Sequence, residues 1–120
     1  MKLSYKKKDN AAVVYLKGRI DIVQSQFIDR EIETLIAMEP AGNFLFDLTE
    51  VEYINSYGLK VLFKTYLALK NQGRTLALCN INNTVRKLFQ ILTNIDDLAI
   101  FDSEEAGIAF LSRRGTGLKK

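Results

Sequence analysis

The sequence predicts a single α/β domain whose sheet is mixed but mostly parallel, with about five strands and four helices. Two observations support this prediction. Apolar, β-branched runs alternate along the chain with segments in which apolar residues recur every three or four positions. The run at 43–48, NFLFDL, is almost continuously apolar, which is typical of a strand buried on both faces of a parallel sheet. At 120 residues, the chain is long enough for one core.

The first third of the chain contains two short strands and a helix. Residues 3–7 (LSYKK) alternate weakly and predict an edge strand, and residues 12–18 (AVVYLKG) are rich in the residues that strands favour. A helix is predicted over 22–38, with Pro40 and Gly42 ending it. Its apolar face is formed by Ile28, Ile32, Leu35 and Ile36.

The middle of the chain connects the buried strand to a second helix. A polar connection follows Asp47 and leads to the turn at 55–58, Asn-Ser-Tyr-Gly. A helix is predicted over 57–71, and Gly73 suits the left-handed conformation that ends many helices. The apolar stripe of this helix consists of Leu59, Leu62, Phe63 and Tyr66.

The last third repeats the alternation of strand and helix. Residues 74–81 predict a strand, and Asn82 or Asn83 is suited to cap the helix that follows. Residues 98–101 predict another short strand. Ser103 is suited to cap the last helix, which has acidic residues in its first turn, where they complement the helix dipole.

The charge of the chain is unevenly distributed. Eight of the 17 basic residues lie within 2–8 or 113–120, whereas all 14 acidic residues lie between 9 and 112. We interpret residues 1–112 as the domain and 113–120 as a basic, flexible tail. The basic ends could attract an anionic partner, but no aromatic residues interleave with them and no nucleic-acid motif is present. A nucleic-acid partner is therefore not expected.

The residue inventory favours a binding module over an enzyme. The chain has no histidine, one cysteine and neither glycine-rich nucleotide fingerprint, so we expect no catalytic residue, no cofactor and no metal. Asp47, Glu50 and Glu52 could hold a hard cation, although such a cluster is more often a solvated loop. Cys79 lies in an apolar run and is expected to be a buried, inert thiol.

Nothing in the sequence resembles a signal peptide or a membrane span. We therefore expect a cytoplasmic protein without stable membrane insertion.

Ser56 stands out because a small hydroxyl would lie at the start of a helix, just beyond a strand. The N-terminus of a helix favours negative charge, so a phosphate would be accommodated there. The alternative is that Ser56 only caps the helix. On the same reasoning, Asp21 is suited to cap the helix over 22–38.

The segment DLTEVEYINSYGL at 47–59 resembles the motif of the STAS domain family, the bacterial anti-sigma factor antagonists and their relatives. LKGRID at 16–21 is similar to the end of the family's second strand. The stretch from 71 to 111 is similar to the rest of the domain. The resemblance covers about residues 3–112, nearly the whole chain.

The resemblance implies a regulatory protein that is switched by phosphorylation. Ser56 occupies the position of the family's phosphorylated serine, and the implied partner is a serine kinase that is also an anti-sigma factor. Asn55 replaces the usual aspartate, and Tyr57 replaces a small residue. Phosphorylation of Ser56 would abolish binding to that partner. The protein itself is expected to be a monomer or a weak dimer.

The same resemblance suggests which residues surround the switch. We expect Asn55, Tyr57, Gly58, Lys60 and Asp21 to contact the partner. The exposed helix face at Lys64 would extend the contact, and Gly58 would permit a close backbone approach or an unusual dihedral. Asp47 is expected near Ser56, at the carboxyl edge of the sheet.

Two other functions are compatible with the sequence. Asn55 and Tyr57 depart from the family pattern, which favours a phosphorylation-independent scaffold or a cytoplasmic subunit of a lipid-transporter complex. A small-ligand sensor, binding a nucleotide or an anion at the start of the Ser56 helix, is the third possibility, and the missing glycine-rich loop argues against tight nucleotide binding.

Overall fold

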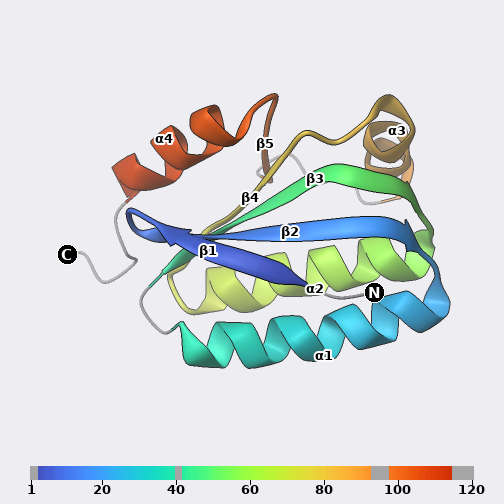
Figure 1. Cartoon of the computed structure of the whole chain (residues 1–120), viewed down its shortest axis with the longest axis horizontal. Coiled ribbons are helices and arrows are strands. Elements are labelled where there is room, and N and C mark those ends of the chain that lie inside the picture. Colours follow the sequence, from blue (N-terminus) through green and yellow to red (C-terminus); the bar gives the residue numbers. More distant parts are fainter. Residues whose placement is uncertain (1–2, 40–41, 93–97, 115–120) are drawn as a thin grey trace.

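The computed structural model describes residues 3–39, 42–92 and 98–114 and shows a five-stranded sheet with four helices (Figure 1). In chain order the elements are β1 (Ser4–Lys8), β2 (Ala11–Ile20), α1 (Ile22–Met38), β3 (Asn43–Ile54), α2 (Ser56–Asn71), β4 (Leu76–Cys79), α3 (Asn83–Leu92), β5 (Ala99–Phe101) and α4 (Glu104–Arg114). The predicted fold class and the order of elements are confirmed. Pro40 and residues 115–120 of the basic tail lie outside the described residues.

The strands lie side by side in the order of the sequence, β1-β2-β3-β4-β5. Only the first pair, β1 with β2, is antiparallel, and the other three pairs are parallel. Each parallel pair is joined by a helix, as parallel strands require. Helices α1 and α2 cover one face of the sheet, and α4 covers part of the other (Figure 1).

Strand β3 is twice as long as the buried run that predicts it. Residues 43–48 are buried, as expected for a strand between two covered faces. The strand then continues through the expected polar connection, residues 49–54, because these residues pair with the end of β2. Two register shifts interrupt the pairing, one between Tyr15 and Lys17 of β2 and one between Gly18 and Arg19.

The core has two parts because the sheet is covered on both faces. The larger cluster lies between the sheet and α1 and α2, and it contains the predicted helix stripes, including Ile28, Ile32 and Leu62. The smaller cluster packs α4 on the other face, through Ile108 and Leu111. The predicted caps at Asn82 and Ser103 are confirmed, since each side-chain oxygen accepts a backbone N–H three residues later.

Candidate functional site

The helices α1 and α2 begin side by side at the end of the sheet where β2 and β3 stop (Figure 1). The backbone N–H of Asn55 donates to the carbonyl of Ile20 at 3.1 Å, which joins the two strand ends. Each helix is capped by the residue before it. The Asp21 carboxylate accepts the N–H of Gln24 at 3.0 Å, and the Asn55 side chain accepts the N–H of Gly58 at 3.1 Å.

Ser56 is the first residue of α2, and its side chain is exposed. The cap is Asn55, which has extended backbone (φ −97°, ψ −175°), so the alternative in which Ser56 itself caps the helix is wrong. The Ser56 hydroxyl is therefore not needed to satisfy the helix end. It remains available to solvent at the point where α2 begins.

The start of α2 is electrostatically suited to an anion. The first turn of α2 contains no acidic residue, and the cap, Asn55, is neutral. The N-terminal end of a helix carries a partial positive charge. Lys60, one turn further along, has its ammonium 5.6 Å from the centroid of the Tyr57 ring. An added negative charge on Ser56 would meet positive potential from the helix and from this lysine.

Lys64, which we expected in the exposed contact face, is already engaged within the chain. Its ammonium lies 2.9 Å from the Asp29 carboxylate and 3.1 Å from that of Glu33, both on α1. Hydrogen bonds to Asp29 and Glu33 raise the pKa of Lys64 above its ordinary value. Lys64 therefore links α1 to α2 and is less available to a partner than Lys60.

Gly58 is required by close packing. A Cβ at this position would lie 2.5 Å from Cγ1 of Ile54 and 2.9 Å from Cγ2 of Ile20. Gly58 is helical, so of the two expectations for this glycine the close approach is confirmed, whereas the unusual dihedral is not. The glycine lets the first turn of α2 sit directly on the ends of β2 and β3.

Asp47 does not lie near Ser56, and that expectation is wrong. Seven further residues of β3, 48–54, follow Asp47 before the strand ends. At about 3.3 Å per residue, these residues span roughly 20 Å. The expectation failed because the strand was predicted to end at residue 48, directly after Asp47, whereas β3 continues to Ile54.

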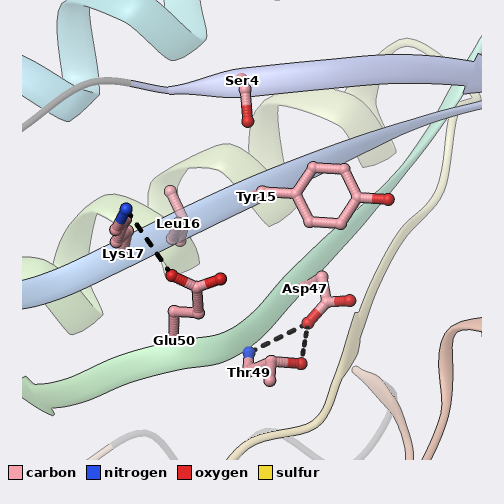
Figure 2. A pocket seen from close by; sticks show the side chains of 7 residues that line it. All are labelled: Ser4, Tyr15, Leu16, Lys17, Asp47, Thr49 and Glu50. Carbon is pink, nitrogen blue, oxygen red and sulfur yellow. Dashed lines mark hydrogen bonds and ion pairs between the residues drawn. The ribbon is translucent and has the colours of Figure 1, made fainter.

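Asp47 instead organises the middle of β3 (Figure 2). Its Oδ1 accepts the backbone N–H of Thr49 at 2.9 Å, the Thr49 hydroxyl at 2.5 Å and the Asn80 amide at 3.3 Å. Burial opposes ionisation of this carboxyl, but the hydrogen bonds from Thr49 and Asn80 outweigh it and lower its pKa. Asp47 therefore has a structural role at the first register shift of the β2–β3 pair.

The three acidic residues considered as a cation site, at positions 47, 50 and 52, do not form a metal-binding group in the described structure. Glu50 pairs with Lys17 at 3.8 Å and lines the same groove of about 370 Å³ as Asp47 and Thr49 (Figure 2). Within residues 3–39, 42–92 and 98–114, no group of three carboxylate, cysteine or histidine side chains could hold a metal ion. Cys79 is buried, as predicted, and burial raises the pKa of its thiol to about 12.

Sequence reasoning missed three exposed apolar residues at the start of α1. These are Ile22, Val23 and Phe27, in the first turns of α1. A signal for them was present, because they lie off the helical stripe formed by Ile28, Ile32 and Leu35.

Comparison with known proteins identifies the same family as the sequence motif at 47–59. A model of the STAS domain matches residues 2–107. The anti-sigma-B factor antagonist of Bacillus subtilis is 28% identical over 86% of this chain and 93% of its own length. The anti-sigma F factor antagonist of Paenibacillus polymyxa is 23% identical, covering 77% of this chain and 79% of the relative.

Solved structures share the fold. An anti-sigma factor antagonist from Mycobacterium paratuberculosis has a TM-score of 0.81 at 20% identity, covering 92% of both chains. Unphosphorylated SpoIIAA has a TM-score of 0.72 at 18% identity, over 93% of this chain and 98% of its own. The murine anion transporter Slc26a9 matches at 0.78 and 16% identity, over 90% of this chain but 18% of the transporter. In the described part of the chain, none of the helices could cross a membrane.

Proposed function

This chain belongs to the STAS domain family, and from that membership we propose that it is an anti-sigma factor antagonist controlled by phosphorylation of Ser56. In this proposal, the unphosphorylated protein binds a serine kinase that is also an anti-sigma factor. Phosphorylation by that kinase ends the binding. Relatives that are named as anti-sigma factor antagonists support the role. A protein of the same fold, SpoIIAA, has been solved in unphosphorylated and phosphorylated forms.

The observation that carries the proposal is the position of the Ser56 hydroxyl. It is exposed on the first residue of α2, and Asn55 already caps the helix. A kinase could therefore reach the hydroxyl without unwinding the helix or removing a structural hydrogen bond. The aromatic side chain of Tyr57, next to it and 48% exposed, offers the kind of surface that anchors protein interfaces.

The proposed switch works through the interface and leaves the fold intact. Phosphate adds about 1.5 to 2 negative charges and three strong acceptor oxygens. At the start of α2 this charge is tolerated by the helix dipole, so the domain remains folded. In a closed interface the same charge would have to be stripped of water, which opposes binding.

Asn55 affects how the phosphate would be held. An aspartate at this position would place a carboxylate beside the phosphate and repel it. Asn55 keeps the oxygen that caps α2 at 3.1 Å but carries no charge. We therefore expect this chain to hold its phosphorylated form with less internal repulsion than a relative with aspartate.

The experiment that tests the proposal is the intact mass of the protein isolated from its native host, beside a Ser56→Ala variant. A single phosphate on the wild type that is absent from the variant supports the switch. Affinity for the purified kinase is then compared between wild type and Ser56→Asp. Absence of phosphate under several growth and stress conditions, or equal affinity for the two proteins, would overturn the proposal.

A phosphorylation-independent scaffold is the second candidate. It is favoured by Asn55 and Tyr57, which both depart from the family motif at the switch. In this case the protein would be a subunit of a membrane transport complex, as the STAS fold also occurs within a transporter. Co-purification with a transporter ATPase, unaffected by Ser56→Asp, would favour this function over the switch.

A further inference from the structure

Strand β1 forms one edge of the sheet (Figure 1). It pairs with β2 on one side, and all five of its residues are exposed. Among the described residues, no backbone hydrogen bond outside that pair involves residues 4–8. An edge strand directs alternate N–H and C=O groups away from the sheet. The outer side of β1 therefore presents a row of backbone groups with which another extended chain could pair.

A groove lies beside this edge, between β1 and the second half of α1. Its volume is about 290 Å³, and its lining consists of Leu3, Tyr5, Glu31, Thr34, Leu35 and Met38. Tyr5 is 41% exposed and Met38 is 61% exposed, so two large apolar side chains meet solvent there. Leu3 and Leu35 connect the groove to the larger core cluster. The groove is thus mostly apolar and open to solvent, next to an unpaired strand edge.

The contacts of β1 show which of its residues face the groove. Successive side chains of a strand point to opposite faces of the sheet. Tyr5 lines the groove, and the ammonium of Lys7 lies 3.3 Å from the carboxylate of Glu39, at the end of α1. The odd-numbered residues of β1 therefore face α1. A strand added at this edge would turn every second side chain into the groove.

The even-numbered residues of β1 face α4 and carry two lysines. The Lys6 ammonium lies 3.4 Å from the carboxylate of Glu104 on α4. Lys8 lies on the same face as Lys6 and is in no ion pair with another described residue. Asp9, the next residue, accepts the hydroxyl of Ser112 on α4 at 3.4 Å.

The edge presents positive charge although carboxylates lie nearby. In the Lys6 pair, the lysine side chain is 52% exposed and that of Glu104 only 24%. In the Lys7 pair, the corresponding values are 66% for the lysine and 16% for Glu39. In both pairs the carboxylate is mostly covered, and the ammonium keeps donors for another acceptor. An approaching chain would therefore meet ammonium groups first.

We propose that the edge of β1 and the groove beside it bind an extended segment of a protein partner, in which apolar residues alternate with acidic ones. The segment pairs with β1 as an added strand, a known mode of peptide recognition. Its apolar side chains enter the groove beside Tyr5 and Met38. Its carboxylates lie on the other face, beside Lys6 and Lys8, and provide the complementary charge.

A second copy of this chain fits the edge less well than an acidic segment. Antiparallel pairing of two β1 strands centred on Lys6 would place the two copies of this lysine opposite each other, and like charges in that arrangement are destabilising. Lysine on an edge strand is a common protection against self-pairing. The same lysines favour an acidic partner, so the edge is selective rather than closed.

The proposed site is independent of the switch at Ser56. The groove begins at Glu31, which lies roughly 15 Å along α1 from the cap at Asp21, at about 1.5 Å per residue. Asp21 and Asn55 mark the end of the fold where α2 starts. Both surfaces could be occupied at the same time, so the chain could connect two partners.

The probe for a test is a blocked seven-residue peptide in which aspartate and leucine alternate, with aspartate at both ends. One control peptide has lysine in place of aspartate, and another is methylated at every backbone amide, so that it cannot donate to β1. Each is titrated into the isotope-labelled protein and followed by the NMR shifts of the backbone amides. We expect shifts to concentrate in residues 3–8 and 31–38, with both control peptides at least about tenfold weaker. No shift in residues 3–8 at about 1 mM of the acidic peptide would overturn the inference.

The chain offers matched controls for the groove. Leu67, on α2, is 42% exposed and matches Tyr5, and Val23, at the start of α1, is 66% exposed and matches Met38. We expect Tyr5→Ser and Met38→Ser to weaken peptide binding at least about fivefold. Leu67→Ser and Val23→Ser should stay within about twofold of wild type. Thermal unfolding checks that each variant is folded, and equal affinities for all four would rule out the groove as the binding site.

The charge on the edge is tested in the same way. Lys8→Gln should weaken binding of the acidic peptide about threefold at low salt and less at high salt, because salt screens exposed charges. Lys87→Gln removes an exposed lysine from α3 and should have no effect. Equal affinities for the two variants would show that the charge of β1 does not select the partner.

Two further measurements separate this inference from its alternatives. Sedimentation of the protein alone shows whether a second copy covers the edge, and a dimer that Tyr5→Ser dissociates would contradict the proposal. Ser56→Asp should bind the peptide within about twofold of wild type. A tenfold loss in that variant would place the peptide at the start of α2 and refute an independent site. The proposed switch is decided separately, by the phosphate on Ser56.

Discussion

The backbone N–H of Asn55, the residue between β3 and α2, donates to the carbonyl oxygen of Ile20, the last residue of β2, at 3.1 Å. One consequence is that the residues that cap α1 and α2, Asp21 and Asn55, are held side by side. Ser56, the next residue after Asn55, is therefore positioned by a contact with β2 as well as by its connection to β3.

Asn55 should contribute to stability as a helix cap. Replacing it with alanine removes the acceptor for the N–H of Gly58, and we expect the free energy of unfolding to fall by about 1 kcal/mol. Asn55→Asp keeps the acceptor and adds a charge that the helix dipole favours, so it should be at least as stable as wild type. Urea unfolding of the three proteins measures both effects. An alanine variant as stable as wild type would contradict the role of this cap.

Gly58→Ala should destabilise the protein although alanine favours helices. The added methyl would lie 2.5 Å from Ile54 and 2.9 Å from Ile20, so these buried side chains must shift. Such overpacking costs about 1–3 kcal/mol, against a gain of about 1 kcal/mol in helix propensity. Gly42→Ala is the control, because its nearest neighbour would be 3.6 Å away. The denaturant midpoint of Gly58→Ala should be lower than that of Gly42→Ala. Equal midpoints would show that the side chains of Ile54 and Ile20 shift without a loss of stability.

Asp47 should make stability depend on pH in the acid range. Its pKa is lower in the folded protein than the ordinary value of 3.8, because hydrogen bonds from Thr49 and Asn80 outweigh the effect of burial. Its ionisation therefore stabilises the fold above about pH 4, and this contribution is lost as the pH falls through the folded pKa. Asp47→Asn should be less stable than wild type at pH 7, with a difference that shrinks towards pH 2.

The measurement for Asp47 is the free energy of unfolding between pH 2 and 7. Glu50→Gln removes an exposed carboxylate from the same strand and serves as the control. A difference between Asp47→Asn and wild type that stays constant over this range would show that ionisation of Asp47 does not contribute.

Cys79 should be chemically inert in the folded protein. Burial, together with the nearby carboxylates of Asp47 and Glu104, raises the pKa of the thiol to about 12, so very little thiolate exists at pH 8. We expect a disulfide reagent such as DTNB to label it only as fast as the protein unfolds. The same thiol should react at once in guanidinium chloride. Rapid labelling without denaturant would mean that β4 is more accessible than its burial indicates.

The sequence was sufficient to predict those features of the fold that a single local pattern of residues determines. The apolar stripe with Ile28 and Ile32 identified the buried face of α1, and Asn82 and Ser103 were identified as caps from their residue type and position. Gly73 adopts the left-handed conformation (φ 73°) that the end of α2 requires. These features depend on residues a few positions apart, which a sequence displays directly.

The second half of β3 could not be predicted from its own residues. An ordinary strand alternates between buried and exposed residues, but here two exposed residues separate Val51 from Ile54, and two more precede Val51. This broken alternation is produced by pairing with β2, and the sequence contains no local sign of it. The error in β3 also misplaced Asp47 relative to Ser56.

The register shifts in β3 have a consequence for comparing this chain with its relatives. Residues 15–20 of β2 are matched by residues 47–54 of β3, which makes the second segment two residues longer than the first. Losing one of the extra residues would straighten the ribbon at that point and turn every later side chain to the opposite side. An alignment that inserts a gap between the aspartate and the serine of the motif would therefore pair residues that point in opposite directions. The number of residues between Asp47 and Ser56 thus sets the direction in which each side chain of this segment points.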